Sequence, residues 1–125
     1  MKPKRPKLPA ISEQVKAWSA ALATETAAWP DVNMKSFFGF TALYRGGMIF
    51  AVLPRTRSLE VPDSFAFKFD KPSSRAHARL KQDPRITAAE VQKARWFAFV
   101  LRCDADLHDA LEWLGKAYEA ARRKA

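Results

Sequence analysis

The stretch that decides the fold is Phe37-Phe38-Gly39-Phe40-Thr41-Ala42-Leu43-Tyr44-Arg45-Gly46-Gly47-Met48-Ile49-Phe50-Ala51. Two strand-like runs meet at Gly46-Gly47, and a glycine pair supplies the positive φ angles that a tight hairpin turn requires. Gly39 indicates a bend or bulge between an earlier strand over 32–38 and the strand over 41–44. The stretch contains no nucleophile, metal-ligand cluster or phosphate-binding loop, so it predicts a fold and is silent about chemistry.

The rest of the chain adds strands and helices to this hairpin. In 64–69 three phenylalanines alternate with Ala66 and Lys68, which is typical of a half-buried strand. Further strands are expected over 48–53 and 96–101, and helices over 12–28, 73–82 and 104–123, while 86–94 fits either a helical turn or a loop. The order α-β-β-β-β-α-β-α predicts an α+β fold, a single-layer antiparallel sheet with helices packed on one face.

Length and composition indicate one domain with its own core, since the chain has 125 residues of which 48% are hydrophobic. Residues 1–9 have a proline at every third position and are expected to form a flexible basic arm, with a single domain over 10–123. Cys103 is the only cysteine, which excludes an intramolecular disulfide and fits a reducing cytoplasm. No apolar run approaches the ~18 residues of a membrane span, so we expect a cytoplasmic protein without a membrane partner.

The net charge of +9 is concentrated at the two ends of the chain. Residues 1–9 contribute +4 and 122–124 contribute +3, which leaves +2 for the remainder. Two interpretations stay open: the ends are solubilising tails, or they bind an acidic surface or nucleic acid electrostatically. Within the body, 45–102 carries +7 and 104–121 carries −4, so we expect a marked charge dipole.

The central hairpin resembles the N-terminal domain family of TfoX, a bacterial competence regulator, whose motif reads Met-Phe-Gly-Gly-x-Gly-Leu-Tyr-x-x-Gly-x-Met-Phe-Ala. The matching residues are Phe38, Gly39, Leu43, Tyr44, Gly47, Phe50 and Ala51, and 65–70 resembles a second strand motif of that family. Phe40 and Ala42 depart from it, because the family has glycine there. The C-terminal half is also similar to MmcQ/YjbR-like proteins and to small bacterial domains labelled "luciferase". The resemblance implies an α+β domain over about 11–123 and says little about function.

Few residues are candidates for catalysis or metal binding. His77 and His108, the only histidines, fall on different expected helices and are expected at the surface. Cys103 precedes the N-terminus of the last helix, where the helix dipole lowers a thiol pKa, but the simpler interpretation is a packed or half-exposed cysteine. The aspartates that begin that helix lack the glycine and glutamate of a calcium loop. We therefore predict no catalytic residue, no cofactor and no metal site.

Basic side chains form the one extended chemical signal. The predicted anion- or partner-binding residues are Arg55, Arg57, Arg75 and Arg79, helped by the arm residues Lys2, Lys4, Arg5 and Lys7. The aromatic residues at 65, 67, 96 and 97 are interleaved with basic ones and can in principle stack on bases, but strand alternation favours a place in the core.

The sequence therefore predicts a small non-enzymatic binding or protein-interaction domain, with an acidic protein as its expected partner. The alternative is a nucleic-acid-binding protein that uses the same basic face and the arm. An enzyme is the third class, and it requires a cleft in which Cys103 or His108 lies beside a second polar group. Both a monomer and a homodimer fit the sequence.

Overall fold

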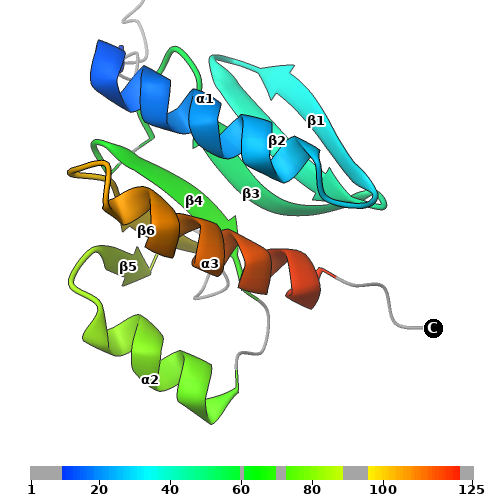
Figure 1. Ribbon diagram of the computed structural model, residues 1–125, viewed down its shortest axis with the longest axis vertical. Coiled ribbons are helices and arrows are strands. Elements are labelled where there is room, and N and C mark those ends of the chain that lie inside the picture. Colours follow the sequence, from blue (N-terminus) through cyan, green and yellow to red (C-terminus); the bar gives the residue numbers. More distant parts are fainter. Residues whose placement is uncertain (1–9, 60, 70–72, 89–95, 122–125) are drawn as a thin grey trace, which may run out of the picture.

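The computed structural model describes residues 10–59, 61–69, 73–88 and 96–121 (Figure 1). These residues form the helices α1 (Glu13–Ala27), α2 (Ser74–Gln82) and α3 (Asp106–Ala120). The strands are β1 (Val32–Phe37), β2 (Phe40–Arg45), β3 (Met48–Pro54), β4 (Ser64–Lys68), β5 (Ile86–Ala88) and β6 (Trp96–Val100). All pair antiparallel in one sheet of order β1-β2-β3-β4-β6-β5, which confirms the predicted α+β class.

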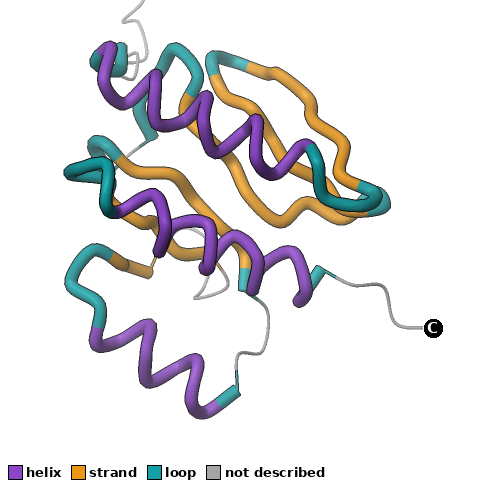
Figure 2. Tube along the Cα trace, in the orientation of Figure 1, coloured by secondary structure: helices purple, strands orange, loops and turns teal. Residues whose placement is uncertain are grey.

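The element order contains a strand that the sequence did not predict. Ile86–Ala88, expected as a helical turn or a loop, is the edge strand β5 and pairs with β6 (Figure 2). Three residues are too few to display an alternating pattern, so the pairing is decided by the neighbouring strand. The observed order is thus α-β-β-β-β-α-β-β-α, and residues 89–94 of that segment lie outside the described residues.

The hairpin between β1 and β2 has a two-residue loop, Phe38-Gly39, because Phe37 pairs with Phe40. Both loop residues have positive φ angles, 46° for Phe38 and 85° for Gly39, as in a type I′ turn. The expected bend at Gly39 is therefore a complete turn, and the register irregularity lies further along, at Leu43/Tyr44. Gly46-Gly47 forms the next hairpin turn as predicted.

Helices α1 and α3 lie across the same face of the sheet, and the core lies between them and the strands (Figure 1). Phe65 and Phe67 are fully buried there and stack on rings of β6 at centroid distances of 5.4 and 5.7 Å. Trp113 of α3 stacks on Phe67 at 5.8 Å. Strand alternation thus correctly predicted that the rings at 65, 67 and 97 belong to the core. The prediction was wrong for Trp96, which is half-buried and pairs with Lys68 on the other face of the sheet.

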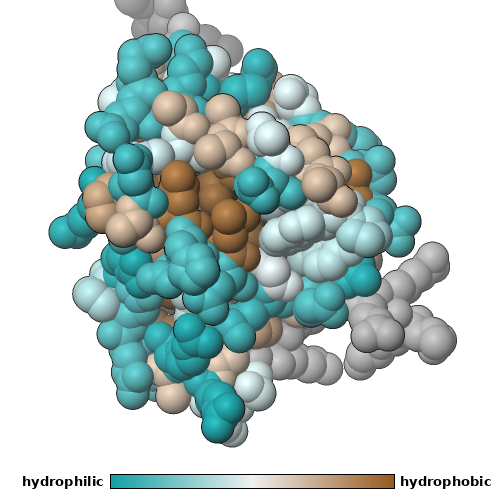
Figure 3. All heavy atoms as spheres, in the orientation of Figure 1, coloured by the Kyte–Doolittle hydropathy of each residue, from teal (hydrophilic) through white to brown (hydrophobic). Residues whose placement is uncertain are grey.

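The helix-covered face has apolar side chains at its centre, between α1 and α3 (Figure 3). Leu107 and Leu111 of α3 are half-buried and pack against the core. Among the described residues, no helix is both long enough and apolar enough to cross a membrane.

Candidate partner-binding surface

The four arginines predicted to share one basic face lie in two separate places. Arg55 and Arg57 follow β3 and contact the turn between β1 and β2, at one edge of the sheet. Arg75 and Arg79 lie on α2, which packs on β5 at the opposite edge (Figure 1). The structure therefore does not bring the two pairs together. The predicted arm residues Lys2, Lys4, Arg5 and Lys7 lie outside the described residues.

The 55–57 loop is clamped to the β1–β2 turn by one carbonyl group. The carbonyl oxygen of Gly39 accepts the N–H groups of Arg55, Thr56 and Arg57 at 2.9, 2.9 and 3.3 Å. A Cβ at Gly39 would lie 2.6 Å from Cγ of Arg57, so only glycine fits this contact. Ala10 forms a bridge with Arg57, which brings the start of the described chain to the same place.

Three phenylalanines gather at the tip of this hairpin. The Phe38 ring is 88% exposed and Phe37 is 40% exposed, whereas Phe40 is half-buried. The ring of Phe37 meets Phe38 edge-on, with centroids 5.9 Å apart, and lies 6.0 Å from Phe40. The tip thus presents an aromatic surface to solvent, which the sequence analysis did not identify.

Phe38 is an unusual choice for this position. A side chain with a Cβ in the left-handed region costs roughly 1–2 kcal/mol, and bulky residues are rare there. Because the ring is almost fully exposed, burial does not offset this cost. Strain that stability does not explain suggests a functional role for the ring. The sequence feature that could have identified this position is a bulky residue directly before the glycine of a two-residue hairpin loop.

The strands that form the tip contain basic but no acidic side chains, although Arg45 lies at the far end of β2, where it is 3.9 Å from Glu119. Residues 32–59 contain four basic and no acidic side chains, and none of the six strands contains Asp or Glu. Strand register places Lys35 and Phe37 on the sheet face opposite Leu43, which is buried in the core beneath the helices. The Lys35 ammonium lies 5.3 Å from the ring centroid of Tyr44. We name Lys35, Phe37, Phe38, Phe40 and Arg55 the hairpin-tip surface.

The arginines on α2 have a different setting. The guanidinium of Arg79 lies 5.3 Å from the ring centroid of the buried Trp113, so its side chain covers the edge of the core. Arg75 is exposed on the same helix.

The densest polar cluster ties β5 to the start of α3. The guanidinium of Arg85 contacts carboxylates of Asp83 at 2.8 Å, Asp106 at 2.8 Å and Asp109 at 3.0 Å. The Asp106 carboxylate also accepts the N–H groups of Arg102 and Cys103 at 2.8 and 3.3 Å. These bonds hold the turn before α3 against β5, which is a structural role.

The same contacts lower the pKa of two carboxyl groups. The side-chain hydrogen bond from Arg85 holds the pKa of Asp83 below its usual value. Burial by itself raises the pKa of Asp106, but hydrogen bonds from the Arg102 N–H, the Arg85 guanidinium and the Cys103 N–H outweigh it and the net pKa is lowered. Both groups are therefore ionised at neutral pH.

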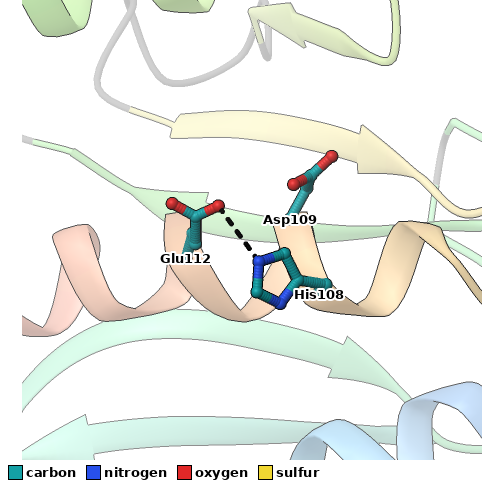
Figure 4. Close-up of side chains that lie close together, drawn as sticks. All are labelled: His108, Asp109 and Glu112. Carbon is teal, nitrogen blue, oxygen red and sulfur yellow. Dashed lines mark ion pairs between the residues drawn. The ribbon is translucent and has the colours of Figure 1, made fainter.

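One trio of possible metal ligands lies on a single turn of α3. His108, Asp109 and Glu112 have ligand atoms within 4.8 Å of one another, and His108 Nε2 lies 3.7 Å from Glu112 Oε1 (Figure 4). His108 is exposed, as predicted, and the Asp109 carboxylate already pairs with Arg85. Cys103 is exposed, so the expectation of a packed or half-exposed cysteine was wrong.

No family model matches the chain, and neither curated proteins nor solved structures contain a match. The resemblance to the TfoX N-terminal domain therefore stays a prediction.

Proposed function

We propose that the protein is a small non-enzymatic binding domain that holds an anionic partner at the hairpin-tip surface. The observation that carries this proposal is Phe38, which has a positive backbone φ and an 88% exposed ring and precedes Gly39, the residue that contacts the loop with Arg55. Backbone strain at a residue whose exposed side chain adds nothing to the core is the kind of observation that supports a functional hypothesis.

The polar groups of the domain support binding more than catalysis. The carboxylates of Asp83, Asp106 and Asp109 are all engaged by Arg85, so their charges stabilise the fold. A cytoplasmic location is part of the proposal, since a lone exposed thiol such as Cys103 is stable in reducing surroundings.

The sign of the partner's charge follows from the surface. The acid-free strands and the four basic residues of 32–59 favour an acidic protein segment or a nucleic acid. A nucleic acid is the second candidate, and the exposed ring of Phe38 favours it because bases offer flat surfaces for stacking. Ala10, where the described residues begin, forms a bridge with Arg57 beside this surface.

Amide chemical shifts test where an anionic partner binds. The full isotope-labelled chain is titrated with a polyglutamate peptide and, separately, with an oligothymidylate. We expect at least one of these to shift the amides of 35–40 and 55–57 at micromolar to millimolar concentration, and Arg55→Gln to weaken that binding. Arg75→Gln removes the same charge from α2 and serves as the control. Shifts confined to α2, or none with either polymer, would refute the proposal.

A further inference from the structure

We infer that the hairpin-tip surface binds single-stranded nucleic acid, with an unpaired base stacked on Phe38 and the flanking phosphates beside Arg55 and Lys35. This inference rests on the proposed function and narrows the partner to one chemical class.

The ring geometry suits stacking on an unpaired base. Phe38 is 88% exposed, so most of its ring is open, and Phe37 supports it edge-on with an interplanar angle of 83°. Bases in a duplex already stack on each other, whereas an unpaired base can stack on a protein ring. The clamp between Gly39 and the 55–57 loop holds the turn in place before the partner arrives, which reduces the entropy that binding costs.

Lys35 and Arg55 lie on the two sides of the turn, so each can meet the nucleic-acid backbone on one side of the stacked base. Lys35 is two residues before Phe37 on the same strand, so both side chains lie on one face of the sheet. On the other side of the turn, the backbone N–H of Arg55 lies 2.9 Å from the oxygen of Gly39, the residue after Phe38. Arg55 is exposed, and the acid-free strands oppose neither charge.

Other occupants fit these observations less well. A second copy that approaches tip to tip brings the same Lys35 and Arg55 and would be repelled. An acidic peptide supplies negative charge but does not require an open phenylalanine ring. An anionic membrane matches both charge and ring, and it enters the test as a competing outcome.

The test separates stacking from charge by using probes that differ only in their bases. Fluorescence anisotropy of the full chain compares a labelled oligothymidylate of about ten nucleotides with an abasic strand of the same length and phosphate number. A duplex, a polyglutamate peptide and phosphatidylserine vesicles complete the set. The variants are Phe38→Gly, which suits the positive φ of the turn, and Arg55→Gln. Met48→Ala, an exposed apolar residue at the other end of the sheet, and Arg75→Gln are the matched controls.

We expect the oligothymidylate to bind about tenfold more tightly than the abasic strand, and Phe38→Gly to abolish that difference. Arg55→Gln should weaken both strands and lower the slope of log affinity against log salt by about 0.7. Equal binding of the two strands, or a preference untouched by Phe38→Gly, would overturn the inference. Tighter binding of polyglutamate or vesicles that depends on Arg55 and Phe38 would also overturn it while the binding proposal survives. If no probe depends on these residues, both proposals fail.

Discussion

Replacing Gly39 with alanine tests whether the hairpin tip is clamped to the 55–57 loop. Gly39 has a φ of 85°, and an added Cβ would meet Cγ of Arg57 at 2.6 Å and Oγ1 of Thr56 at 2.8 Å. Two costs therefore arise together: backbone strain, and a clash with side chains that are held by the loop.

Gly47 separates the two costs. Its φ is 88°, nearly that of Gly39, but nothing lies within 4 Å of the position of its Cβ. Strain in the left-handed region destabilises the fold by roughly 1–2 kcal/mol. In either variant, alanine also lowers the conformational entropy of the unfolded chain, which stabilises the fold by about 0.4–1 kcal/mol. Gly47→Ala should thus destabilise the fold by about 1 kcal/mol. The clash adds roughly 1–3 kcal/mol, so Gly39→Ala should cost about 2–4 kcal/mol.

Urea denaturation of both variants measures the difference. We expect the midpoint of Gly39→Ala to fall well below that of Gly47→Ala with an unchanged m value, since the same surface is exposed on unfolding. Equal midpoints would mean that Arg57 and Thr56 move aside at no cost, and the description of a clamped tip would then be wrong. Hydrogen exchange at the amides of 55–57 provides the local readout, because their bonds to the Gly39 carbonyl should open first in Gly39→Ala.

Three further outcomes are expected. Asp106→Asn removes one of the three charged partners of Arg85 and weakens the turn before α3, so urea denaturation at neutral pH should report a loss of about 2 kcal/mol, whereas an unchanged midpoint would contradict that role. The pKa values of Asp83 and Asp106 are lowered in the fold, so the stability that these carboxylates contribute is present above the unfolded pKa of about 3.9 and is lost as pH falls through the lower folded values. The urea midpoint should therefore fall when the pH is brought below about 4, and it should fall less in Asp106→Asn. Phe38→Gly should leave the melting temperature unchanged or raise it, because relief of strain offsets the added chain entropy; a clear loss of stability would show that the ring serves the fold.

Local features of the fold were predictable because their signals lie within a few residues. Ser12, at the start of the helix predicted over 12–28, caps α1, with its hydroxyl oxygen accepting the N–H of Val15. The alternation in 64–69 correctly placed Phe65 and Phe67 in the core, because successive side chains of a strand point to opposite faces. Gly46-Gly47 forms the turn that its positive φ angles allow.

The candidate surface was predictable only in part. Arg55 was identified from its charge, but its grouping with Arg75 depended on an approach of β3 to α2 that the sheet order prevents. Phe38 was assigned to a strand, since its neighbours are apolar and a run of aromatic residues favours extended structure. Its position in the turn follows from the pairing of Phe37 with Phe40, a contact that no local pattern specifies.

The sequence by itself determined the three helices, five of the six strands that the structure describes, and the place of Phe65 and Phe67 in the core, because turn glycines, caps and alternation act over short distances. Only the tertiary structure decided that Ile86–Ala88 becomes an edge strand, that the arginines separate into two groups, and that the Phe38 ring faces solvent beside a basic loop. The physical reason is that pairing and exposure are properties of two segments in contact. They depend on which segments the packed core brings together, and the sequence of one segment does not specify its partner.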